Sequence, residues 1–189
     1  MTDVNTASAS PFSPAEAAAL LRIDRDLLQS VFTSVPVDIL RWRPPAGEWC
    51  ALEVLGHLCE TEERGFAGRI RSILAEPRPQ FRGWDPDSVA RARRDWEADP
   101  ARIIAEFVER RDAGIALIES LGEADLTRGG DHPEVGFLTV RDLLQEWVFH
   151  DANHLRQLLA NMQAYAWPHM GNAQRFSAPN QDESPELAH

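Results

Sequence analysis

The sequence contains no lysine: its 19 basic residues are all arginine. Without a lysine amine the chain cannot form a Schiff base with a carbonyl substrate or use a lysine nucleophile. Cysteine is almost absent too, and its two residues, Cys50 and Cys59, exclude a disulfide framework and indicate a reducing compartment. No apolar run approaches the ~20 residues that cross a bilayer. These absences favour a cytoplasmic protein.

Positive charge is scarce relative to negative charge, since 30 acidic residues give the chain a net charge of −11. An acidic surface repels the phosphates of nucleic acids and anionic lipid headgroups. The first residues, MTDVNTASASPFS, lack the basic start and apolar stretch of a secretory signal. We therefore expect no nucleic acid and no membrane among the partners.

Apolar residues recur at helical spacing in four long segments, which predicts four amphipathic helices. Ser13-Pro14-Ala15-Glu16 is a capping box with proline at the first helical position, and Pro36 ends the helix that follows. The other three helices are expected over about 51–75, 99–122 and 139–162, with Cys50, Asp99 and Thr139 as their capping residues. Because no two-residue alternation of apolar side chains occurs, we predict an all-α four-helix bundle without a sheet.

Three segments between these helices are rich in helix-breaking residues. Prolines and a glycine argue against a helix in 37–49, and 123–138 is expected to be a loop. Residues 76–99 form a long crossover between the second and third helices, with a short helix over 87–97. We divide the chain into a disordered leader (1–12), a bundle (13–165) and an irregular C-terminal tail (166–189).

Two histidines of the last helix, His150 and His154, are four residues apart, so both imidazoles leave the same helix face. A bare His-x-x-x-His often arises by chance, and a histidine on a bundle face is more often packed than bound to a ligand. His57 lies on a polar line beside the apolar face of the second helix. Burying three unpaired imidazoles is costly, and one shared metal ion would remove that cost by taking their lone pairs. The three histidines therefore predict a metal site.

Four polar side chains near these histidines are candidates for assisting the site. Glu60 lies three residues after the first histidine, and Glu146 lies one turn before the second. Either carboxylate could orient an imidazole or act as a general base, and either could instead be a surface group. Asn153 and Gln157 share a neighbouring face, where they could bind polar groups of a substrate or face solvent.

The remaining reactive side chains are interpreted as bystanders. We expect Asp151, His132, His169, Arg110 and Arg111 to face solvent, Cys59 to point away from the histidines, and Cys50 to be a packed thiol at a helix cap. The run Arg91, Arg93 and Arg94 could hold an anionic substrate, but a solvated helix face is the simpler interpretation. Gly56, Gly65 and Gly68 of the second helix each cost ~1 kcal/mol relative to alanine, which indicates close backbone approach or a bend.

Short motifs in a fixed order connect the chain to a known family. They are Glu48-Trp49, Glu53-Val54-Leu55-Gly56-His57-Leu58, Phe137-Leu138-Thr139-Val140-Arg141-Asp142-Leu143-Leu144 and His150-Asp151-Ala152-Asn153-His154-Leu155-Arg156-Gln157-Leu158. Over about residues 14–165 the sequence resembles the DinB-like (DinB/YfiT) superfamily. The resemblance implies a four-helix bundle with a divalent metal, commonly zinc or nickel, bound by His57, His150 and His154. Cys50 stands where the family frequently has serine or threonine, which affects a helix cap and leaves the ligands intact.

Three imidazoles leave a tetrahedral metal ion one open position, the arrangement of a catalytic site. Through the resemblance we expect a thiol-dependent transferase or isomerase of a small molecule, using a low-molecular-weight thiol such as bacillithiol or mycothiol. One alternative is a metal-dependent hydrolase in which Glu60 or Glu146 activates water. Another is a non-catalytic stress-response module in which the metal only stabilises the bundle. The resemblance also implies a homodimer.

Overall fold

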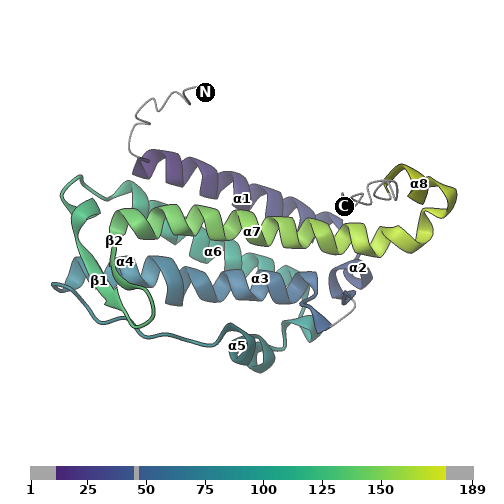
Figure 1. Cartoon of the computed structure of the whole chain (residues 1–189), viewed down its shortest axis with the longest axis horizontal. Coiled ribbons are helices and arrows are strands. Elements are labelled where there is room, and N and C mark those ends of the chain that lie inside the picture. Colours follow the sequence, from purple (N-terminus) through teal and green to yellow (C-terminus); the bar gives the residue numbers. More distant parts are fainter. Residues whose placement is uncertain (1–11, 45–46, 178–189) are drawn as a thin grey trace, which may run out of the picture.

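The computed structural model describes residues 12–44 and 47–177, and four long helical segments dominate this part of the chain (Figure 1). The helices are α1 (Pro14–Ser34), α2 (Val37–Arg41), α3 (Ala51–Glu60), α4 (Ala67–Ala75), α5 (Pro86–Arg93), α6 (Pro100–Glu119), α7 (Val140–Ala166) and α8 (Gln174–Ser177). A π-helical turn, Thr61–Phe66, joins α3 to α4, and the strands are β1 (Gly129–His132) and β2 (Gly136–Thr139). The predicted four-helix bundle is confirmed.

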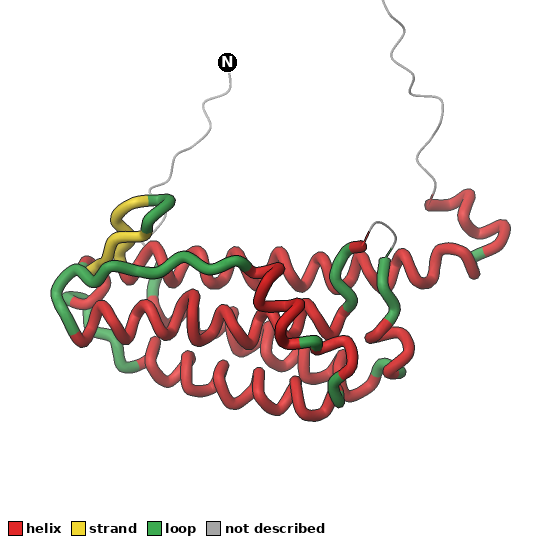
Figure 2. The backbone as a smooth tube through the Cα atoms, turned by 90° about the horizontal axis from the view of Figure 1, so that it is seen from below, coloured by secondary structure: helices red, strands yellow, loops and turns green. Residues whose placement is uncertain are grey.

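The four long segments lie side by side and bury their apolar faces in two neighbouring clusters (Figures 1 and 2). One cluster lies toward the hairpin end and includes Leu21, Ile70, Ile118 and Trp147. The other lies toward the opposite end and includes Phe32, Leu52, Phe107 and Leu158. Caps fix where the helices begin, because capping boxes precede α1 and α7 and the side chain of Asp99 accepts a hydrogen bond from Ala101 at the start of α6.

The second long segment is continuous but is widened by its π-helical turn. A Cβ on Gly68 would lie 1.8 Å from the backbone oxygen of Glu63, so the widened turn requires a residue without a side chain here. A Cβ on Gly56 would lie 1.8 Å from Oδ2 of Asp95 in the crossover. Both causes considered for these glycines therefore occur, a backbone irregularity at one position and close approach at the other.

The prediction of no sheet is wrong, since 123–138 contains an antiparallel hairpin. Gly129 pairs with Thr139 and His132 pairs with Gly136, whose φ of 81° suits glycine at the turn. The strands are four residues long and one is half glycine, so too few side chains alternate to give a period-2 signal. The expectation of no helix in 37–49 is also wrong, because the short helix α2 precedes the prolines.

The crossover between α4 and α6 is held against the bundle by ion pairs of Arg93. This guanidinium contacts the carboxylates of Glu60, Asp95 and Glu106 and is only 16% exposed. The interpretation of the arginine run as a solvated face is therefore wrong for Arg93, although Arg91 and Arg94 are exposed. The short helix predicted over 87–97 is confirmed as α5 followed by a 3₁₀ turn, Asp95–Glu97.

Beyond α7, two 3₁₀ turns, Trp167–His169 and Gly171–Ala173, lead to α8, so this part of the tail is more regular than expected. Phe176 of α8 is almost fully exposed. The expected leader, apart from Phe12, and residues 178–189 of the expected tail lie outside the described residues. Among the helices that the structure describes, none has the length and apolar character to span a membrane.

Candidate metal centre

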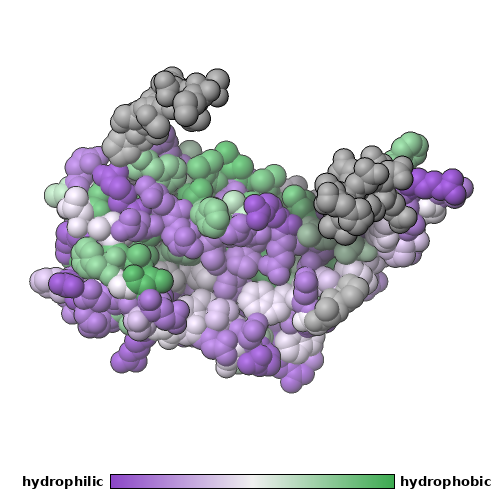
Figure 3. Space-filling model, in the orientation of Figure 1, coloured by the Kyte–Doolittle hydropathy of each residue, from purple (hydrophilic) through white to green (hydrophobic). Residues whose placement is uncertain are grey.

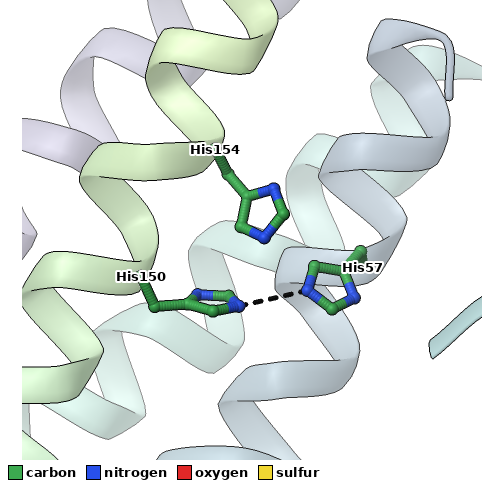
Figure 4. Close-up of side chains that lie close together, drawn as sticks. All are labelled: His57, His150 and His154. Atoms are coloured by element: carbon green, nitrogen blue, oxygen red, sulfur yellow. Dashed lines mark hydrogen bonds between the residues drawn. The ribbon is translucent and has the colours of Figure 1, made fainter. Parts of the chain in front are cut away.

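The three predicted histidines lie together between α3 and α7 (Figure 4). His57 comes from α3, whereas His150 and His154 come from successive turns of α7. One nitrogen from each ring lies within 4.8 Å of the other two. The chain thus brings together side chains that are about 90 residues apart in sequence, as the helical periodicity predicts.

The nitrogen positions fit a single metal ion. His57 Nε2 lies 3.1 Å from His150 Nε2, and nitrogens bound at 2.0–2.1 Å by one tetrahedral zinc ion would be about 3.4 Å apart. His150 Nδ1 contacts Asp151 Oδ1 at 3.2 Å, and His154 Nδ1 contacts Gln157 Oε1 at 2.9 Å. Both α7 imidazoles therefore have an outer nitrogen held by an oxygen and an inner nitrogen available as a ligand.

The protonation states of the ligands also suit a metal. Burial, and secondly the neighbouring imidazoles, lower the pKa of His57 to about 3. Burial and the charge of His150 likewise lower the pKa of His154. Both rings are therefore neutral at pH 7 and keep the lone pair that a metal requires.

Aromatic rings enclose the histidines. Trp84 of the crossover stacks on His57 with ring centroids 5.7 Å apart, and Trp49 lies against the same imidazole at 5.0 Å. Phe66 contacts the His150 ring edge-on at 5.3 Å. His57 Nδ1 is buried and has no hydrogen-bond partner among the described residues. The rings restrict water around the site, so charge on a ligand held there is weakly screened.

Two expectations fail at the buried ion network behind His150. Asp151 is 1% exposed rather than solvated, and Arg111 is fully buried between Asp151 and Glu62. Arg111 Nε donates to Glu62 Oε1 at 2.8 Å, and Trp147 Nε1 donates to the same oxygen at 3.2 Å. Although burial disfavours its charge, Arg111 and His150 lower the pKa of Asp151, so this carboxylate is ionised. Burial raises the pKa of Glu62 despite Arg111.

A signal for this network exists in the sequence. Asp151 lies seven residues after Leu144 and seven before Leu158, on the apolar stripe of α7, and Arg111 lies four residues after Phe107 and four before Ile115 on α6. Charged residues at core positions are expected to be paired. Asp151 shares the register of the buried leucines, so the prediction that it faces solvent is wrong.

The other candidates differ in their relation to the histidines. Gln157 contacts His154, whereas Asn153 is half-buried with no role shown. Glu60 bonds to Arg64 and Arg93, which hold its pKa below the usual value even though burial opposes this. Glu146 is exposed on α7. Neither glutamate contacts a histidine in the part of the chain that the structure describes.

The cysteines and the remaining histidines stand apart from the centre. Cys50 is buried, and burial raises the pKa of its thiol to about 11, as suits a packed residue. Burial likewise raises the pKa of Cys59, whose thiol points toward the carbonyl of Ile103. His169 is exposed as expected, but His132 is half-buried on β1, which corrects its placement in solvent.

Comparison with known proteins finds relatives whose names refer to metal dependence, in agreement with the cluster of three histidines. The chain is 24% identical over 122 residues to the "Putative metal-dependent hydrolase YfiT" of Bacillus subtilis, covering 64% of this chain and 68% of that protein. A Bacillus licheniformis protein that also carries the name "Putative metal-dependent hydrolase" is 26% identical over 122 residues, covering 64% and 69%.

The fold is shared with a solved structure. It is described as "YfiT from Bacillus subtilis is a probable metal-dependent hydrolase with an unusual four-helix bundle topology" and superposes with a TM-score of 0.74 and 21% identity. The match covers 82% of this chain and 88% of that one. The family model described as DinB superfamily matches residues 20–158, which is most of the chain. The chain therefore belongs to the DinB superfamily.

Proposed function

We propose that this chain is a divalent-metal-dependent hydrolase of a small molecule, with His57, His150 and His154 as the metal ligands. The observation that carries the proposal is the convergence of three imidazole nitrogens, two of them on rings whose outer nitrogen is already held by an oxygen. Three imidazoles would leave a bound zinc or nickel ion one open position, and the ion would lower the pKa of water there. The names of the similar Bacillus proteins support the same reaction class.

The chain's own groups position the ligands and exclude bulk water. Asp151 and Gln157 fix the orientation of the two α7 imidazoles, and Trp49 and Trp84 cover His57. Glu60 is a poor candidate for the general base, because two guanidinium groups already occupy its oxygens. Glu146, one turn before His150 and exposed, is the better placed of the two carboxylates.

A second candidate is the transfer of a small thiol, with a thiolate in place of water. The observation that favours it is that, among the described residues, no carboxylate bonds directly to the three histidine rings except the buried Asp151, which Arg111 already neutralises. A thiol needs less help from a general base than water does, because its pKa is already near 8.5. The nucleophile then comes from solution, since Cys50 and Cys59 are buried away from the site.

Metal content and turnover of the purified full chain test the proposal. We expect about one zinc or nickel ion per chain, loss of the metal in His57→Ala, and no loss in His169→Ala, which removes an exposed histidine. The zinc-loaded protein should hydrolyse p-nitrophenyl acetate faster than the chelator-treated protein. Faster reaction of glutathione with 1-chloro-2,4-dinitrobenzene, without ester hydrolysis, would instead identify the thiol reaction. Wild-type protein that gains no metal on zinc or nickel addition would refute both.

We also propose that two copies of the chain form a homodimer. Apolar side chains are exposed along α1 and on the neighbouring outer face of α7 (Figure 3); they include Leu20, Ile23, Leu27, Phe149 and Leu159. A face of this kind suits a second copy of the chain. Light scattering on a size-exclusion column should give twice the chain mass of 21.2 kDa, and Ile23→Arg with Leu27→Arg should restore the monomer. A monomeric wild type would refute the dimer.

A further inference from the structure

Arg69 of α4 is a half-buried cation that forms no ion pair with any carboxylate of residues 12–44 and 47–177. Its Nε–H is buried and finds no acceptor among the described residues, whereas Arg111 and Arg93 are each held by two or more carboxylates. The guanidinium lies over the ring of Phe81 at 5.5 Å, a contact with its face that leaves the N–H edge free. Burying a donor without an acceptor is costly, so the site is better satisfied with a ligand than without one.

The carboxylate of Glu134 does not pair with the guanidinium of Arg69. Glu134 of the hairpin acts on the charge of Arg69 from a distance, and its Oε1 lies beside Gly83 of the crossover instead. His132 of β1 faces the same space; burial, and then the charge of Arg69, lower the pKa of its imidazole. A neutral imidazole and a guanidinium together form a donor pair; Asp142 and Glu146 line the same space but form no ion pair with Arg69 in the described part of the chain.

Two hollows meet at Arg69. One is a cavity of about 1030 Å³ between α4, the hairpin and α7, with apolar walls that include Phe66, Leu138 and Leu143. The other is a groove of about 500 Å³ between α4 and the crossover, which reaches Trp84. A large apolar hollow with a few polar groups is the usual form of a small-molecule site.

Each hollow also borders the metal centre through one aromatic ring. Phe66 of the cavity wall contacts His150, and Trp84 at the end of the groove stacks on His57. Arg69 lies twelve residues beyond His57 on the same continuous helical segment, a rise of about 18 Å, part of which its own long side chain can span. A ligand that joins the two sites must therefore be elongated.

We propose that Arg69 binds the carboxylate of an elongated, otherwise apolar substrate whose reactive group lies at the three histidines. This substrate class rests on the proposed hydrolytic function, but the binding of the carboxylate does not. A single guanidinium matches the planar, singly charged carboxylate through two parallel N–H···O bonds. The apolar walls hold the body of the molecule, and the net charge of −11 makes anion binding depend on this local cation.

Binding of 6-phenylhexanoate and of its amide, 6-phenylhexanamide, to the full chain tests the proposal. Dissociation constants are measured by ligand-observed NMR on zinc-loaded and on chelator-treated protein, because a metal ion can itself bind a carboxylate. In both forms the carboxylate should bind about tenfold or more tightly than the amide, which corresponds to one charge-assisted hydrogen-bonded contact. Arg69→Gln should abolish the preference and Arg69→Lys should retain part of it.

The matched control is Arg71→Gln, two residues along α4, where the guanidinium is exposed and pairs with Glu63. This variant should keep the full preference for the carboxylate. Equal affinity of wild-type protein for the two probes would overturn the proposal, even if Arg69→Gln fails to fold. A preference that appears only with zinc and survives Arg69→Gln would overturn it as well, since the metal would then hold the carboxylate. If the chain binds no metal but the preference depends on Arg69, the proposed hydrolase fails and the carboxylate site stands.

Discussion

Asp151 connects the metal centre to the interior, since one oxygen contacts His150 and the other accepts from Arg111. Asp151→Asn removes the negative charge that fixes and polarises the imidazole, and we expect zinc affinity to fall about 10- to 100-fold. Competition with a chromophoric chelator measures this change. Asp112→Asn, which alters an exposed carboxylate paired with Arg25, should leave the affinity unchanged. An unchanged affinity in folded Asp151→Asn would show that the imidazole is fixed by packing alone.

Asp24 of α1 is a buried carboxylate whose pKa is raised to about 6 by burial and, next, by the charge of Asp151, with Arg111 opposing. The carboxyl proton of Asp24 is held more tightly in the folded state than in the unfolded state. The decrease in the free energy of unfolding that Asp24 causes therefore grows as pH rises from about 4 to 6. We therefore expect Asp24→Asn to raise the free energy of unfolding above pH 6 by about 1 kcal/mol, allowing for solvent near the group. Urea unfolding at pH 8 and pH 4.5 tests this, because the gain should be clearly smaller at the lower pH, where the penalty has only begun to develop. A gain of equal size at both values would rule out titration of Asp24 as the cause.

At the scale of residues, the sequence predicted the convergence of the three histidines better than their surroundings. The three histidines follow from helical spacing and from the cost of burying imidazoles without partners. Gln157 was named for its face, and the structure places it on His154. The core register of Asp151 and Arg111 is visible in the sequence, but their pairing with Glu62 is not, because Glu62 lies in the π-helical turn of another segment. Sequence periodicity contains no information about such a pairing.

The π-helical turn Thr61–Phe66 is the element that sets the register of the second long segment. An extra residue in this turn rotates α4 relative to α3, so His57 can face α7 while Glu62 still reaches Arg111 in the core. Gly68→Ala should destabilise the fold by roughly 2–4 kcal/mol, because the new Cβ would meet a backbone oxygen that cannot move away. Gly65→Ala is the matched control: its Cβ would meet only Thr61 side-chain atoms at 3.5 Å, and the higher helix propensity of alanine should leave stability equal or slightly raised. Thermal unfolding of both variants provides the comparison, and equal melting temperatures would contradict the close contact at Gly68.

Elements long enough to repeat the apolar pattern several times were predictable from the sequence, and short elements were not. The capping boxes and prolines located the ends of the four long helices within a few residues. The hairpin and α2 are each too short for a period to develop, and they are held by tertiary contacts. Arg78 binds Asp131 of β1 from the crossover, for example. The π-helical turn was visible only as an excess of glycine, which does not distinguish a widened turn from close packing.

At the scale of the molecule, the metal centre joins the second and the last long helical segments, which pack through their apolar faces. A ligand that binds only the folded state stabilises it by about 2.7 kcal/mol when present at 100 times its dissociation constant. For a chain of this size the melting temperature should then rise by about 5–10 °C. Differential scanning calorimetry with and without zinc should show this shift in the wild type and in His169→Ala but not in His57→Ala. A shift that survives in His57→Ala would place the metal elsewhere.

Turnover, measured beside the calorimetric shift, separates a catalytic centre from a purely structural one. A structural metal needs only to connect α3 to α7, so Arg69→Gln should keep the full thermal shift under either role. If the centre is catalytic and the substrate bears a carboxylate, Arg69→Gln should raise KM for carboxylate-bearing p-nitrophenyl esters about tenfold while p-nitrophenyl acetate is hydrolysed as before. Wild-type protein that shows the thermal shift but hydrolyses no ester and transfers no thiol would contain a structural metal. Because the two measurements depend on different side chains, each role predicts its own combination of results.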